Sequence, residues 1–308
     1  MASIKVSVQA EPRDIDSWSS LARRLESNGF EALVVGDHPG AGASPWPALG
    51  AAAAVTATLK LGTYVLQCGV RDPVQAAADA ATLDILAPGR VLLGLGAGHT
   101  FREWEATGRN RPSPADRAGR LVEFVDAVAR LLNGETVTTD GRYLRLVDAC
   151  LEDLPVAGGV QLIVGGGNPQ ILRVAAARAQ VVALSGLGRT RPDGHRHEAR
   201  WTSADLLAQL NVVHDESERR GTVPAIEALV QVVTATEDRP QALADLSERL
   251  HGVPVGDLDN TPFLLVGTIE DMAAQLVHQA EQLNITRYVV REPAIDPITR
   301  VLALLNER

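Results

Sequence analysis

The sequence contains few of the residues on which several protein classes depend. Two cysteines, Cys68 and Cys150, cannot build a disulfide framework in 308 residues, so we expect a reducing compartment, the cytoplasm. No uncharged apolar run approaches the roughly 18 residues that a membrane-spanning helix requires, and no membrane partner is expected. The first residues alternate like a strand and lack the basic and apolar regions of a secretory signal.

Positive charge is also scarce. The net charge is −9 and no basic run occurs, so nucleic acid is not an expected partner. Lys5 and Lys60 are the only lysines among the 29 basic residues. Arginine in place of lysine, together with abundant alanine, is typical of a GC-rich genome of the actinobacterial kind. The sequence also lacks a Gly-x-Ser-x-Gly element, which excludes the α/β-hydrolases that depend on it. It lacks a Walker motif as well, which excludes the P-loop nucleoside triphosphatases.

What is present is a repeated alternation of short apolar or β-branched runs with longer segments of helical periodicity. Strand–helix units of this kind predict a parallel sheet, and the first turn carries no dinucleotide fingerprint. We therefore predict an α/β protein of the (β/α)8 TIM-barrel class, with residues 1–308 as a single domain. The predicted strands are residues 4–8, 32–36, 61–66, 91–95, 161–164, 181–184, 226–233 and 287–290.

Two insertions interrupt the regular units. Residues 136–146 contain two β-branched runs around Asp140-Gly141, which predicts a small β-hairpin. Residues 185–200 are rich in Gly, Arg and His and are expected to form a mobile loop. His195 and His197 lie in that loop, but no third ligand stands at close spacing, so a solvated loop is expected and no metal site is predicted.

Candidate functional residues follow the predicted strands, because a barrel places its site at the carboxyl ends of its strands. Asp37 and His38 follow the second strand, where an imidazole could move a proton near neutral pH. Gly96, Ala97 and Gly98 follow the fourth strand, and such glycines allow a ligand to approach the backbone. Each of these loops could equally be an ordinary polar turn.

His99, which comes directly after those glycines, is a second candidate acid or base. The fifth strand ends in Gly165, Gly166 and Gly167, followed by Asn168 and a proline that suits a helix start. Free backbone N–H groups and a helix N-terminus together predict an anion site, with phosphate as its natural guest. Glu103 and Glu105 are interpreted as residues that begin a helix.

Taken in order along the chain, these pieces resemble the bacterial luciferase-like superfamily of flavin- and deazaflavin-dependent barrels. The matching pieces are residues 29–38 (GFEALVVGDH), 61–66 (LGTYVL), 80–86 (AATLDIL), 89–90 (GR), 93–98 (LGLGAG), Glu103, 106–108 (ATG), 141–143 (GRY), 163–167 (IVGGG) and 266–271 (VGTIED). Each piece is weak alone, but the ordered set covers nearly the whole chain.

The resemblance implies a cofactor ring against the third strand, at a non-proline cis peptide bond between Tyr64 and Val65. It implies that the cofactor phosphate lies on Gly166, Gly167 and Asn168, and that residues 96–98 line the cofactor. Members of the sugar-phosphate dehydrogenase branch carry a glutamate where this chain has His99. That difference suggests that His99 takes the role of the acid.

The resemblance leaves two cofactors, coenzyme F420 and FMN, and the Asp-His pair favours F420. The expected activity is that of an F420-dependent oxidoreductase, which transfers hydride between the reduced deazaflavin and a small unsaturated metabolite or side chain. The expected assembly is a homodimer. The alternatives are an FMN-dependent monooxygenase and a non-catalytic flavin-binding barrel. A phosphate-binding aldolase is disfavoured because Lys5 and Lys60 stand at the beginnings of strands, away from the expected site.

Overall fold

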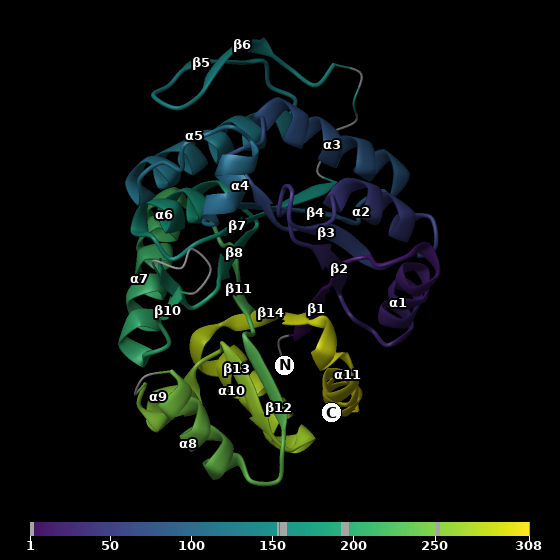
Figure 1. Ribbon diagram of the computed structural model, residues 1–308, viewed down its shortest axis with the longest axis vertical. Coiled ribbons are helices and arrows are strands. Elements are labelled where there is room, and N and C mark those ends of the chain that lie inside the picture. Colours follow the sequence, from purple (N-terminus) through teal and green to yellow (C-terminus); the bar gives the residue numbers. More distant parts are fainter. Residues whose placement is uncertain (1–2, 153, 155–158, 192–196, 251–252, 308) are drawn as a thin grey trace.

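The computed structural model describes residues 3–152, 154, 159–191, 197–250 and 253–307. Its centre is a closed barrel of parallel strands surrounded by helices (Figure 1). The order around the barrel is β1, β14, β11, β8, β7, β4, β3 and β2. The predicted (β/α)8 barrel is therefore confirmed, and parallel closure places the carboxyl ends of all these strands at one rim.

Each predicted strand supplies one strand of the barrel, with shifts of a few residues at the ends. The barrel strands are β1 (Lys5–Gln9), β2 (Ala32–Val35), β3 (Lys60–Gln67), β4 (Val91–Gly96), β7 (Val160–Gly165), β8 (Val181–Leu184), β11 (Ala225–Leu229) and β14 (Ile285–Arg291). The predicted strand at residues 226–233 is wrong in one respect. It divides into β11 and a second strand, β12 (Val232–Ala235), which leaves the barrel to pair with β13 (Leu264–Gly267).

The helices begin where the sequence offers a cap. Asp14 accepts hydrogen bonds from the N–H groups of Asp16 and Ser17, and Thr268 forms a capping box with Asp271. The helices are α1 (Ile15–Ser27), α2 (Pro45–Ala53), α3 (Pro73–Leu86), α4 (Phe101–Ala106), α5 (Pro114–Leu132), α6 (Pro169–Arg178), α7 (Ser203–Arg220), α8 (Arg239–Arg249), α9 (Val255–Asn260), α10 (Ile269–Leu283) and α11 (Ile295–Asn306), with the 3-10 turn η1 (Glu292–Ala294).

The predicted hairpin is confirmed as β5 (Val137–Asp140) paired with β6 (Arg145–Ala149). Glu123 of α5 fixes its turn by accepting hydrogen bonds from three backbone N–H groups, those of residues 142–144. The polar segment 185–200 contains a second hairpin, formed by β9 (Leu187–Thr190) and β10 (His197–Ala199), which the prediction of a loop missed. His195 lies outside the described residues.

The side chains inside the barrel differ between its centre and its amino-terminal end. Small and branched side chains fill its centre, among them Ala32, Val34, Leu92, Ile163 and Val289. Charged groups gather at the amino-terminal end instead, where Lys60 lies 2.9 Å from Glu31 and Arg287 lies 3.4 Å from Glu227. Lys5, 3.6 Å from Glu31, joins the same cluster. The two lysines therefore lie at the end of the barrel opposite the carboxyl rim.

Strands β3 and β4 approach more closely than two ordinary strands could. A Cβ atom added at Gly94 would lie 2.2 Å from the carbonyl oxygen of Thr63, and one at Gly96 would lie 2.3 Å from a Val65 methyl. The pairing register shifts between Thr63 and Leu66, which marks a bulge in β3. The neighbouring strand therefore requires the glycines of β4, a packing requirement that no sequence pattern reveals.

We expect Gly94→Ala to destabilise the fold by about 1–3 kcal/mol or more, because the added methyl meets backbone atoms that cannot move aside. Gly50→Ala is the matched control, since a Cβ there meets nothing within 4 Å. Gly50 lies inside α2, so its replacement should stabilise the protein by about 0.5–1 kcal/mol. Urea unfolding measures both variants, and an unchanged stability for Gly94→Ala would contradict the close contact.

Candidate active site

A cavity of about 940 Å³ opens at the carboxyl rim of the barrel. Every residue predicted for the site lines it: Asp37, His38, Tyr64, Val65, Gly96, Ala97, Gly98, His99, Gly165, Gly166, Gly167 and Asn168. Its volume is within the range of small-molecule and cofactor sites, about 300–1,000 Å³. Residues from both described strands of the second hairpin, such as Leu187 and His197, form part of its wall.

His38 and Glu103 form an ion pair in the cavity, with Nδ1 of His38 2.7 Å from Oε1 of Glu103. The hydrogen bond that Nδ1 donates to Glu103 raises the pKa of His38, although burial of the ring opposes this. Burial disfavours the ionised form of Glu103, but the hydrogen bond from His38 outweighs it and holds the pKa of that carboxyl below its usual value. The second ring nitrogen, Nε2, is left without a hydrogen-bond partner in the described part of the chain.

Glu103 is a cavity residue that the sequence pattern does not single out as a candidate acid. It was interpreted as a helix-start residue, yet its side chain is only 3% exposed and its second oxygen accepts a hydrogen bond from Gln67 Nε2 at 3.1 Å. It lies on α4, which follows the loop after β4. The available signal was its place in one of the pieces that match the luciferase-like superfamily.

Asp37 serves a different role from the one expected. The sequence places Asp37 beside His38 as a candidate functional residue, but its carboxylate accepts two hydrogen bonds from Arg71, at 2.7 and 3.0 Å, and one from the backbone N–H of Gln67. Glu103, and not Asp37, makes the direct contact with His38. Asp37 therefore ties the end of β3 to the loop after β2, and its charge is compensated by Arg71.

His99 lines the cavity, but its pKa is too low for it to act as an acid at neutral pH. Burial and the neighbouring His197 lower the pKa of His99 to about 4. The two rings meet edge to face, with centroids 4.6 Å apart. His99 is thus a neutral imidazole near pH 7. Glu103 can instead supply the carboxylate that the sugar-phosphate dehydrogenase branch carries at the position of His99.

The glycines after β4 also have a structural explanation. A Cβ at Gly98 would lie 2.0 Å from the side-chain oxygen of Gln67, so this glycine, with φ of +70°, makes room for that side chain. Gln67 in turn contacts both Asp37 and Glu103. We expected residues 96–98 to open a path for a ligand, but two of them accommodate β3.

The turn after β7 has the features of an anion site. Asn168 caps α6 by accepting a hydrogen bond from the N–H of Gln170, and Pro169 occupies the first turn. The N–H groups of Gly167 and Asn168 have no hydrogen-bond partner among the described residues. Unpaired donors at a helix N-terminus, facing a cavity, suit a phosphate group.

The Tyr64–Val65 peptide bond is cis, as the resemblance implied. The carbonyl oxygen of Tyr64 accepts a hydrogen bond from Nε2 of Gln9 at 2.6 Å. The Val65 side chain lies over the glycines of the neighbouring strands and is 3.5 Å from where a Cβ of Gly165 would be. Val65 therefore forms the floor of the cavity between the His38 side and the anion turn.

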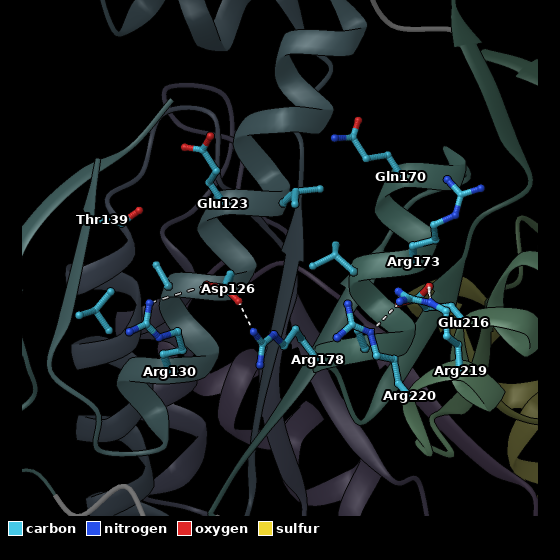
Figure 2. Close-up of a pocket in the computed structure, with 15 residues that line it drawn as sticks. Glu123, Asp126, Arg130, Thr139, Gln170, Arg173, Arg178, Glu216, Arg219 and Arg220 are labelled. Atoms are coloured by element: carbon cyan, nitrogen blue, oxygen red, sulfur yellow. Dashed lines mark hydrogen bonds and ion pairs between the residues drawn. The ribbon is translucent and has the colours of Figure 1, made fainter. Parts of the chain in front are cut away.

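A second cavity, of about 470 Å³, lies outside the barrel between α5, α6 and α7 (Figure 2). Four of its arginines have acidic partners: Asp126 pairs with Arg130 and Arg178, and Glu216 pairs with Arg219 and Arg220. The described residues contain no cluster of three or more metal-binding side chains, and none of their helices has the length and apolarity needed to cross a bilayer.

The chain belongs to the luciferase-like monooxygenase family, whose model matches residues 2–287. Among curated proteins it is similar to the F420-dependent glucose-6-phosphate dehydrogenase of Beutenbergia cavernae, with 37% identity over 194 residues. That match covers 59% of this chain and 55% of the relative, so the chain spans about half the length of the curated relatives it matches.

Two solved structures have the same fold over almost the whole chain. The F420-dependent tetrahydromethanopterin reductase of Methanopyrus kandleri matches with a TM-score of 0.74 and 18% identity, covering 98% of this chain and 97% of that one. An F420-dependent secondary alcohol dehydrogenase in complex with an F420-acetone adduct matches with a TM-score of 0.75 and 19% identity, covering 98% and 99%. At these identities the likeness establishes the barrel fold.

We expect His38 to titrate above its ordinary pKa of 6.5 and His99 at about 4, as followed by NMR of the imidazole nitrogens. Glu103→Gln should lower the pKa of His38, because it removes the paired negative charge. Glu105→Gln is the control, since Glu105 is exposed and makes no side-chain contact with the histidine. A pKa of His38 that does not respond to Glu103→Gln would show that the ion pair is not formed.

Proposed function

We propose that this protein is an F420-dependent oxidoreductase that transfers hydride between the deazaflavin and a small unsaturated or alcohol substrate. The observation that carries the proposal is the His38–Glu103 pair, 2.7 Å apart, in a cavity that also contains an anion-binding turn. The His38–Glu103 pair can move a proton, and the turn after β7 can hold a cofactor phosphate.

The relatives support F420 as the cofactor. The curated relatives are named F420-dependent glucose-6-phosphate dehydrogenases, with 31–37% identity over about half of their length. Two of the structures with the same fold are named as F420-dependent enzymes. The residues also fit such a cofactor, since the unpaired N–H groups of Gly167 and Asn168 would hold its phosphate and Val65 would lie behind its ring.

When bound, the deazaflavin accepts or donates a hydride at its ring. The protein must then supply or remove the accompanying proton at the substrate. His38 is suited to this task because Glu103 holds Nδ1 and raises the pKa of the ring, which leaves Nε2 as the donor. Its side chain is 42% exposed and lines the cavity, so a substrate can reach it.

Binding of the purified protein to F420 and to FMN, followed by tryptophan fluorescence, tests the cofactor. We expect F420 to bind more tightly. Loaded protein is then mixed with a panel of enones, imines, secondary alcohols and sugar phosphates, and the redox state of the deazaflavin is followed by absorbance. Tighter binding of FMN with oxygen consumption would support a monooxygenase, and binding without any redox change would support a non-catalytic barrel.

Gly167→Asp should weaken F420 binding by about tenfold or more, because its carboxylate would repel the phosphate at close range. Gly167→Ala is the matched control. Its methyl adds no charge and comes closest to the Gln209 side-chain oxygen, at 3.2 Å, so binding should change little. Fluorescence titration measures both variants, and equal affinities would remove this turn from the cofactor site.

His38→Ala should lower turnover about 10²- to 10⁴-fold and leave F420 affinity nearly unchanged, which is the signature of a lost proton donor. Glu103→Gln should cost less and should move the pH profile toward acid, because His38 then loses its proton more readily. His99→Ala is the comparison. A loss confined to His99→Ala would transfer the role of the acid to that residue.

A further inference from the structure

Gln67 joins the two buried carboxylates at the rim of the barrel. It is the last residue of β3, lines the cavity and is only 3% exposed. Its backbone N–H donates to Oδ2 of Asp37 at 3.0 Å, and its side-chain Nε2 donates to Oε2 of Glu103 at 3.1 Å. A change of the Gln67 side chain therefore leaves the first of these hydrogen bonds in place and removes the second.

The orientation of the Gln67 amide is fixed from two sides. The backbone N–H of Gly69 donates to Oε1 at 2.9 Å, and because a backbone N–H can only donate, the oxygen of the amide must face it. Gly98 lies against the same group, since a Cβ there would come within 2.0 Å of Oε1 and 2.3 Å of Nε2. Gln67 therefore offers Glu103 a donor and cannot offer it an acceptor.

Glu103 uses its two oxygens on different partners. Oε1 faces Nδ1 of His38 at 2.7 Å, and Oε2 accepts the hydrogen bond from Gln67. Burial disfavours ionisation of Glu103, but hydrogen bonds from other side chains outweigh it and hold the pKa of the carboxyl below its usual value; the donors are His38, Gln67 and Thr100. A hydrogen bond to a carboxylate is roughly twice as strong as one between neutral groups, so the amide stabilises the ionised form and makes Glu103 a weaker base.

His38 and Glu103 compete for one proton, the one that lies between Nδ1 and Oε1. The hydrogen bond to Glu103 raises the pKa of His38 against the effect of burial, and the charges of Glu11 and Asp37 add to the rise. His99, another titratable ring that lines the cavity, is neutral at pH 7 because its pKa is about 4. The position of the proton thus depends both on the charges around the ring and on the hydrogen bonds to the carboxylate.

We propose that Gln67 is a positioning residue that keeps the shared proton of the His38–Glu103 pair on His38. This role rests on the proposed function for its effect on turnover, whereas the effect on the pair requires no cofactor. When Nε2 of His38 gives its proton to the substrate, the proton on Nδ1 stays in place, directed at Glu103. The next proton then returns to Nε2, and the neutral ring keeps one tautomer throughout turnover.

Gln67→Met, which is close to glutamine in length and donates no hydrogen bond, should raise the pKa of His38. Without the amide the Glu103 carboxylate is a stronger base and holds the imidazolium more tightly. Glu103→Gln should lower the same pKa, so the two variants shift it in opposite directions. NMR of the imidazole nitrogens in the cofactor-free protein measures both shifts. In the loaded enzyme the basic limb of turnover against pH should move toward alkali in Gln67→Met and toward acid in Glu103→Gln.

Gln279→Met is the matched control. Gln279 is 2% exposed, and its Nε2 donates to the backbone carbonyl of Thr261 at 3.0 Å, so this variant also loses a buried amide. It lies on α10, which contributes no described residue to the cavity wall, and it should leave the pKa of His38 unchanged. Gly98→Ala should raise that pKa as Gln67→Met does, because the added methyl displaces the amide, and it carries the test if Gln67→Met does not fold.

A rise in the pKa of His38 that is confined to the Gln67 and Gly98 variants would support the proposal. A fall in folded Gln67→Met would mean that the amide only holds Glu103 in place and would overturn it, as would an unchanged value. An equal rise in Gln279→Met would also overturn it. If the confined rise is found in a protein that neither binds nor oxidises reduced F420, the proposed function fails while the role of Gln67 in the pair stands.

Discussion

The close approach of β3 and β4 is the constraint on which the site depends. Because Gly94 and Gly96 have no side chains, β3 can bulge toward β4 and direct Val65 over the floor of the cavity. The bulge also sets the position of Gln67 at the end of β3. Gln67 then donates its backbone N–H to Asp37 and its amide to Glu103, so the partner of His38 is positioned by this strand. The pairing of His38 with Glu103 at the rim of the barrel is thus linked to the packing of β3 against β4.

The barrel could be predicted from the sequence because its strands are short apolar runs separated by capped helices. The eight predicted strands all contribute to the barrel. The pair β12–β13 could not be separated in advance, since residues 226–233 form one apolar run and only the fold shows that the chain turns out of the barrel within it. The hairpin β9–β10 was hidden by its polar composition, because its residues are only partly buried and show no alternation.

The location of the site could be predicted from the sequence, but the pairs of side chains that contact one another within it could not. The rule that strand ends meet at one rim was sufficient to gather all of the predicted residues around one cavity. It could not show that Asp37 turns toward Arg71 and that His38 turns toward Glu103, because adjacent residues in a sequence point in different directions. Nor could it distinguish two histidines of similar placement. The pKa of His38 is raised by its carboxylate partner, whereas the pKa of His99 is lowered by burial and by a second histidine beside it.

The scarcity of lysine has a practical consequence. The only two side-chain amines, those of Lys5 and Lys60, lie at the amino-terminal ends of β1 and β3, around Glu31. The cavity opens at the other end of the same strands. Lysine-directed coupling would therefore attach the molecule by the closed end of its barrel, so an immobilised or fluorescently labelled preparation would keep the mouth facing solution and free of the attached group.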